Sequence, residues 1–75
     1  MPKPPRTTAA KVLKALRRAG FFIHHQSGSH VNLRHPAKPH LHVVIPRHRH
    51  DLAPKTLKAI IAQAELTIEE FASLL

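Results

Sequence analysis

The hydrophobic pattern of this chain changes its period twice, and that change constrains the fold more than any other feature. Between residues 9 and 19, apolar residues recur three and four positions apart, which is the spacing of one helix face. Residues 30–34 alternate between polar and apolar, which is typical of a half-buried strand. Residues 41–45 are rich in β-branched residues, and residues 57–64 return to helical spacing. The order predicts a helix, then strands, then a second helix.

Capping and turn residues mark the ends of the first elements. Thr7 or Thr8 is suited to cap the first helix, and Gly20 is suited to end it. Residues 21–25 combine aromatic and β-branched side chains, so we expect a strand there, the first of three.

The second half of the chain carries equally clear boundaries. Asp51 is expected to cap the next helix, which has Pro54 in its first turn. Thr67 is followed three residues later by Glu70, and this capping box predicts a short final helix. The predicted fold class is therefore α+β, a two-layer sandwich of the order α-β-β-β-α with a short extra C-terminal helix.

Residues 8–75 are expected to form this single domain, and residues 1–7 a flexible basic arm. Strand alternation would point Val31 and Leu33 toward the helices. The opposite, open face of the sheet would carry His30, Asn32, Arg34, His42 and Val44. The remaining core is expected to consist of Val12, Leu16, Phe21, Ile23, Leu57, Ile60, Ile61 and Phe71.

Charge is distributed unevenly along the sequence. Twelve Lys and Arg stand against four acids, a formal net charge of +8, and residues 1–50 contain no acid. Such a field favours a polyanionic partner, either nucleic acid, an anionic membrane surface or an acidic protein; the alternative is a solvated basic surface. The absence of cysteine excludes disulfides and thiolate metal sites. We expect a cytoplasmic protein, because neither a secretory signal nor a membrane-length apolar run is present.

The stretch Gly28-Ser29-His30 is the main candidate site. It should form a turn that delivers His30 to the start of a strand on the open face, beside the basic loop 47–50. Histidine titrates near neutral pH and can exchange protons with ribose and phosphate oxygens. The alternative is a turn histidine bonded to the backbone. Gly28 is either a plain turn residue or lets a phosphate approach closely, and Ser29 is either a phosphate donor or a turn residue.

Two other groups of residues are candidates for binding. Lys14 and Arg18 lie on a basic face of the first helix, which is either a phosphate-binding surface or an ordinary solvated face. Histidines two apart, at 40 and 42 and at 48 and 50, have a spacing that suits zinc. We expect no metal site, because cysteine is absent and neighbouring cations would repel a metal ion.

Over residues 8–73 the chain resembles the HicA toxins, also called YcfA-like proteins. The resemblance rests on an ordered set of short motifs: Gly20-Phe21, Gly28-Ser29-His30, Arg34-His35-Pro36, Val43-Val44-Ile45-Pro46, Lys55-Thr56-Leu57 and Ile68-Glu69-Glu70-Phe71. Two positions depart from the family pattern, since many members have glycine where this chain has Lys55 and Glu65.

The resemblance implies a fold like a double-stranded-RNA-binding domain and ribosome-independent cleavage of mRNA, with His30 as the catalytic residue. We expect no metal or other cofactor, because the ribose 2′-hydroxyl can be the nucleophile. The resemblance also implies a HicB-type antitoxin that covers the His30 face, with the toxin monomeric when free and part of a hetero-oligomer with its antitoxin. The phosphate-binding residues would be Gly28, Ser29, Arg34, Arg47, His48, Arg49, Lys14 and Arg18.

A second acid or base is left open among His24, His42 and His48. Two other functions also stay open. One is a non-catalytic RNA-binding module on the same fold, and the other is a protein that uses charge alone on DNA or a membrane surface.

Overall fold

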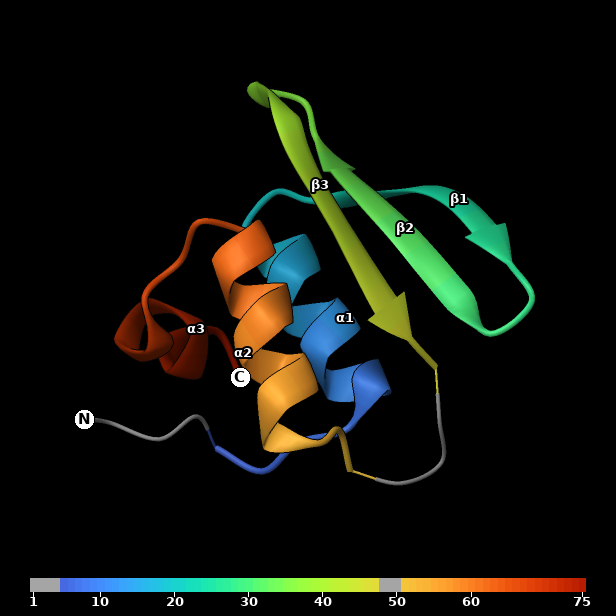
Figure 1. Ribbon diagram of the computed structural model, residues 1–75. Helices are drawn as coiled ribbons and strands as arrows, with labels where there is room; N and C mark the ends of the chain where they lie inside the picture. The colour runs from blue at the N-terminus through green and yellow to red at the C-terminus, as the bar shows by residue number, and fades with distance from the viewer. Residues whose placement is uncertain (1–4, 48–50) are drawn as a thin grey trace.

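The computed structural model describes residues 5–47 and 51–75. Three helices lie on one side of an antiparallel sheet (Figure 1). The elements are α1 (Ala9–Arg18), β1 (Phe22–Ser27), β2 (His30–His35), β3 (Lys38–Pro46), α2 (Pro54–Gln63) and α3 (Ile68–Leu74). The predicted α+β class, the element order and the short final helix are confirmed. None of the helices described is long and apolar enough to span a bilayer.

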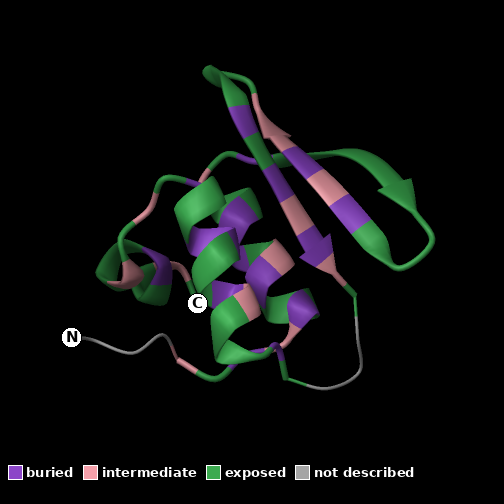
Figure 2. Cartoon of the chain, in the orientation of Figure 1, coloured by how far each residue is buried: buried purple, intermediate pink, exposed green. Residues whose placement is uncertain are grey.

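The sheet has the order β1-β2-β3, and β2 pairs with β3 as an antiparallel hairpin. His30 lies opposite Pro46, and Arg34 lies opposite His42. Alternate residues of β2 and β3 are buried against the helices, which gives the striped pattern of Figure 2. The buried face of the sheet consists of Val31, Leu33, Leu41, Val43 and Ile45. Their polar neighbours are therefore held on the open face.

The helices complete one hydrophobic core against this face. Its helical members are Ala9, Val12, Ala15, Leu16, Leu57, Ile60, Ile61 and Phe71. Phe21, directly after α1, is also buried. On the outer edge of β3, the Gln63 side chain of α2 accepts a hydrogen bond of 3.1 Å from the Val44 amide. The helical layer thus covers β2 and β3 and closes one edge of the sheet.

Strand β1 lies outside this cover, and every one of its residues is exposed. The prediction that Ile23 belongs to the core is wrong, because this residue is 41% exposed. Ile23 lies opposite the buried Leu33 and so on the helix side of the sheet. The helices pack against β3 and do not extend over β1, as Figure 1 shows.

The caps are confirmed in part. Thr8 caps α1 by accepting from the Lys11 amide, and the capping box of α3 is formed as predicted. The prediction that Asp51 caps α2 is wrong, since that helix begins after Ala53 without a side-chain cap. Asp51 instead bridges to Thr8 through the backbone and forms an ion pair with Arg6 at 3.6 Å. Thr7 is buried, and its carbonyl accepts from the Leu52 amide at 2.9 Å.

Candidate active site and nucleic-acid interface

A two-residue turn delivers His30 to the start of β2. Ser27 pairs with His30 across this turn, so Gly28 and Ser29 are its central residues. Gly28 has φ +56°, whereas Ser29 is not among the residues with positive φ. This combination is typical of a type II′ hairpin turn, whose first central position requires glycine. Gly28 is thus needed for the geometry of the turn, which is the first of the two roles considered for it from the sequence.

The same turn is also tied to the end of β3. The Arg47 amide donates to the Ser29 carbonyl at 2.6 Å. His30 therefore has a turn on one side and the start of the basic loop on the other. The prediction that Arg47 lies beside this turn is confirmed. His48 and Arg49, also predicted as phosphate-binding residues, lie outside the described residues.

Cross-strand pairing arranges the open face in three rows. Residues directly opposite one another in an antiparallel sheet point to the same face. The rows are Ser27–His30–Pro46, His25–Asn32–Val44 and Phe22–Arg34–His42. Successive rows are about 7 Å apart, because each is two residues further along a strand. The strands that form this face contain no acidic residue.

The direct neighbours of His30 bring no second titratable group, since they are Ser27 and Pro46. His42 lies two rows away, where its Nε2 bonds the Asn32 side-chain oxygen at 2.9 Å. The nearest row holds His25, which is exposed.

The sequence interpretation considered His24 and missed His25. His25 is opposite Asn32 and Ile23 is opposite Leu33, so His24 is an extra residue, a β-bulge. Strict alternation over residues 21–25 could not reveal this shift. Counting backward from the Gly28 turn is the signal that places His25 on the open face.

Arg34 lies at the far end of β2. Four residues along a strand correspond to about 13 Å, so its Cα is well separated from that of His30. Its Nη1 points across the second hairpin and donates to the Pro39 carbonyl at 3.5 Å. Arg34 and His30 thus share the open face, as predicted, in different rows.

Lys14 and Arg18 lie on another surface. They line a shallow pocket on the outer side of α1 with Arg6, Thr7, Lys11 and Leu75. The Arg18 Nη1 donates to the Leu74 carbonyl at 2.6 Å, which joins α1 to the end of α3. Since the helices cover the opposite face of the sheet, these cations are not grouped with His30. The molecule therefore has two separate basic surfaces.

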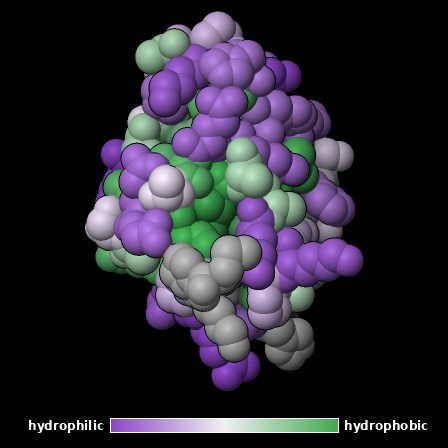
Figure 3. All heavy atoms as spheres, turned by 60° about the vertical axis from the view of Figure 1, so that its left-hand side comes forward, coloured by the Kyte–Doolittle hydropathy of each residue, from purple (hydrophilic) through white to green (hydrophobic). Residues whose placement is uncertain are grey.

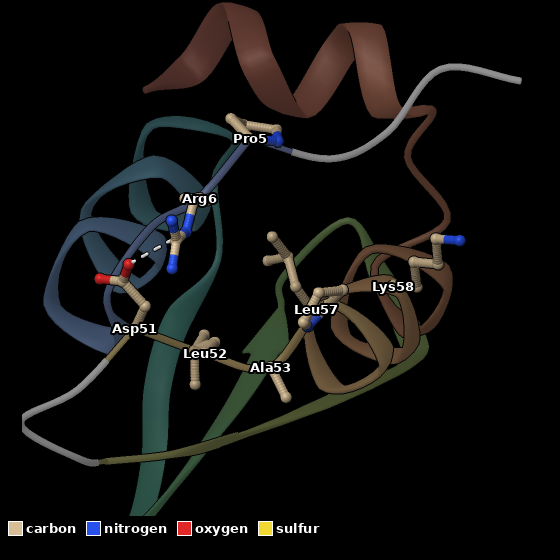
Figure 4. A pocket seen from close by; sticks show the side chains of 8 residues that line it. Pro5, Arg6, Asp51, Leu52, Ala53, Leu57 and Lys58 are labelled. Atoms are coloured by element: carbon tan, nitrogen blue, oxygen red, sulfur yellow. Dashed lines mark ion pairs between the residues drawn. The ribbon is translucent and has the colours of Figure 1, made fainter.

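A more apolar hollow opens on the helical side, where Figure 3 shows a hydrophobic area bordered by hydrophilic residues. The pocket is lined by Pro5, Arg6, Asp51, Leu52, Ala53, Pro54, Leu57 and Lys58. The ion pair of Arg6 with Asp51 lies on one side of it, as the close-up shows (Figure 4). Its lining, as far as residues 5–47 and 51–75 form it, contains no histidine, and the pocket lies away from the open face. Within residues 5–47 and 51–75, no three side chains of His, Asp or Glu are grouped to hold a metal ion.

Fold and site together define a small α+β domain whose open sheet face carries three histidines and Arg34, with Arg47 directly after the last strand. The family model described as the HicA toxin of bacterial toxin-antitoxin systems matches residues 9–66. The chain belongs to this family, and it is the toxin of a toxin–antitoxin system, which implies an antitoxin partner. A search of curated proteins found no match.

Proposed function

We propose that this toxin is an endoribonuclease that cleaves mRNA without the ribosome, with His30 as general acid or base. The observation that carries the proposal is the position of His30. Its imidazole is exposed on the open face, beside a glycine turn and Arg47. A site of this kind lets a phosphodiester approach the imidazole with no part of the helical layer in the way.

The reaction requires two proton transfers. A base removes the proton of the ribose 2′-hydroxyl, whose oxygen then bonds to phosphorus while the bond from phosphorus to the 5′-oxygen breaks. An acid protonates that leaving oxygen, which gives a 2′,3′-cyclic phosphate and a 5′-hydroxyl. The nucleophile is part of the substrate, so the mechanism requires no metal. Arg47 stabilises the negative charge that develops on the phosphate.

His25 is our candidate for the second proton-transfer group. It lies on the same face as His30 and in the adjacent row. Diagonal neighbours in an antiparallel pair have Cα atoms about 7–8 Å apart, within reach of long side chains. One imidazole would act as base and the other as acid. The pH–rate profile of the wild type is then bell-shaped, and His25→Ala removes one of its limbs.

The central experiment compares two variants with the wild type on single-stranded RNA in the presence of EDTA. His30→Ala should abolish cleavage and growth arrest without unfolding the protein, because the side chain is exposed. His24→Ala is the matched control, an exposed histidine at the bulge, and should cleave like the wild type. RNA that is methylated at the 2′-oxygen should be spared. Undiminished cleavage by His30→Ala would show that His30 is not the catalytic group. An RNA that binds but is never cut would favour a non-catalytic binding module.

The antitoxin is proposed to be HicB-type and to cover the open face. An acidic inhibitor there would shield the charge and His30 together, and electrostatic attraction would speed its capture. Arg47→Glu should therefore slow association more than it speeds dissociation, which stopped-flow kinetics with the protein encoded beside the toxin can measure. Lys58→Glu on α2 makes the same change of charge away from this face. If RNA and antitoxin bind together without competition, inhibition by occlusion is wrong.

A further inference from the structure

Phe22 is an exposed aromatic ring on the open face. The residue is 43% exposed, and it lies opposite Arg34 in the row that ends in His42. The preceding Phe21 is buried and contacts His35. The two adjacent phenylalanines thus have different environments, one in the core and one on the surface that also carries His30.

The β-bulge at His24 is what points this ring to the open face. With strict alternation from Ser27 backward, Ile23 would lie on the open face and Phe22 on the helix side. The extra residue reverses that assignment, so that Phe22 faces Arg34 and Ile23 faces Leu33. Single exposed apolar residues are common and need no explanation by themselves. A bulge that redirects an aromatic side chain onto the face of a candidate active site is more specific, since bulges near active sites commonly do this.

We propose that Phe22 is a base-stacking site for single-stranded RNA, with Arg34 and His42 beside it. The inference rests on the proposed function and specifies its substrate, because a stacking site requires an unpaired base. Arg34, in this row, lies four positions along β2 from His30, a distance of about 13 Å. A strand of RNA that follows β2 would thus place its scissile phosphate at His30 and a base a few nucleotides away on Phe22.

The charge and chemistry of the row favour RNA over a protein partner. The ring lies in the same cross-strand row as Arg34 and His42, and no acid occurs anywhere in the sheet. Aromatic side chains on a sheet stack bases in several RNA-binding folds, and arginine attracts the adjoining phosphates. On the same face, the Asn32 and His42 side chains bond each other at 2.9 Å and offer polar atoms to base edges.

The first test measures affinity. All variants carry His30→Ala so that the RNA stays intact, and the probe is a fluorescein-labelled single-stranded oligonucleotide read by anisotropy. Removal of a stacking ring costs about 1–3 kcal/mol per base, so Phe22→Ala should weaken binding roughly 5-fold to 150-fold. Phe22→Tyr should retain affinity, whereas Phe22→Leu should not. Ile23→Ala is the matched control, because Ile23 is the next residue, equally exposed, on the other face.

A second test reads the contact directly. The chain contains no Trp or Tyr, so a single introduced tryptophan is its only strong fluorophore. Phe22→Trp should be quenched when RNA binds, since a stacked base quenches an indole. Ile23→Trp should change little. Circular dichroism of each variant shows whether the fold is retained.

The outcomes separate this inference from the proposed function. If Phe22→Ala binds RNA like Ile23→Ala, or if both tryptophans are quenched equally, the stacking site is wrong even where His30→Ala abolishes cleavage. If Phe22→Ala loses affinity only for the antitoxin, the ring belongs to the protein interface and the inference is overturned. If His30→Ala still cleaves, the proposed function fails, while the stacking site is judged on affinity and quenching alone.

Discussion

At the scale of single residues, the contacts of the His35 ring explain why Gly20 and Phe21 occur together with it. Its Nε2 lies 3.1 Å from the Ala19 carbonyl, and its Nδ1 accepts from the Ala37 amide at 3.1 Å. The carbonyl can only accept, so Nε2 carries the hydrogen. The ring also contacts Phe21 edge-on, with centroids 5.0 Å apart. His35 is thus a structural histidine with both ring nitrogens bonded.

Gly20 should be far less tolerant of substitution than Gly28. A Cβ at Gly20, where φ is +100°, would lie 2.7 Å from the His35 Nε2, whereas one at Gly28 meets nothing within 4 Å. Positive φ costs a non-glycine residue about 1–2 kcal/mol. Gly20→Ala would also break the hydrogen bond between the His35 Nε2 and the Ala19 carbonyl. The free energy of unfolding should therefore fall by about 2–3 kcal/mol in total. Urea unfolding of both variants measures the difference.

The matched background for this test is His35→Ala. Without the imidazole, the methyl group of Gly20→Ala meets no ring. The loss of unfolding free energy that Gly20→Ala causes in this background should therefore fall to that of Gly28→Ala. An unchanged cost would show that backbone conformation alone, rather than the contact with His35, determines the glycine.

The open face could be predicted residue by residue only where alternation is regular. His30, Arg34 and His42 follow from a clean period of two in β2 and β3, and the structure places them as predicted. Phe22 and His25 could not be found in this way, because one extra residue reverses the alternation in β1. The direction of the Arg34 side chain toward Pro39 depends on its rotamer, which no sequence pattern specifies.

At the scale of elements, α1 and α2 end in the same motif with different residues. In each, two amides after the helix bond back to its last turn: Gly20 to Arg17 and Phe21 to Leu16, and likewise Glu65 to Ala62 and Leu66 to Ile61. This is the Schellman arrangement, which requires positive φ at its first residue beyond the cap. Gly20 satisfies that requirement easily, whereas Glu65 adopts φ +56° as the one non-glycine described with positive φ.

Glu65→Gly should therefore stabilise the protein. Relief of the positive φ is worth about 1–2 kcal/mol, and the greater freedom of unfolded glycine offsets about 0.5–1 kcal/mol of it. The contact of Glu65 with His40, at 3.5 Å between exposed side chains, contributes little. We expect a net gain of about 0.5–1 kcal/mol in the free energy of unfolding. Glu65→Ala, which removes the same contact but keeps the backbone strain, should show no such gain.

The capping box of α3 should make stability depend on pH in the acid range. Hydrogen bonds from the Thr67 backbone amide, and then from its hydroxyl, lower the pKa of Glu70 below its ordinary value. A lowered pKa in the folded state gives stability that is present above the unfolded value, about 4.3, and is lost as pH falls through the folded value. Glu70→Gln keeps an acceptor that does not titrate.

Unfolding measured from pH 7 to pH 2 should therefore be less acid-sensitive for Glu70→Gln than for the wild type. Glu69→Gln, in the same first turn, controls for the general effect of removing a negative charge near the helix start. Equal acid sensitivity in both variants would mean that the box contributes no pH dependence.

The element boundaries show which sequence signals are decisive. Thr8, Pro54 and the capping box were predicted because their local hydrogen bonds and dihedral angles are self-contained. Asp51 was assigned incorrectly because a carboxylate suited to a cap is equally suited to an ion pair, and here Arg6 lies within reach. A tertiary contact of this kind has no signature in the spacing of residues.

At the scale of the whole molecule, two basic surfaces lie on different layers. RNA affinity should fall steeply with salt, because each neutralised phosphate releases counterions. We expect Lys14→Glu to weaken binding of all RNA sequences alike, since phosphate contacts do not read sequence. Lys58→Glu on α2 changes the net charge equally and is the control. If both variants lose the same affinity, α1 contributes only to the general charge.

The unequal cover of the sheet has a consequence for its local stability. Strand β1 buries no side chain and has no helix over it, so it can open at a small fraction of the global unfolding free energy. Amide hydrogens of β1 would then exchange with solvent long before those between β2 and β3. Ser29 stays bonded to Arg47 during such an opening, and His30 stays paired with Pro46. The proposed catalytic imidazole is thus carried by a strand that stays paired with β3, while Phe22 and His25 belong to a strand that can detach and return on its own.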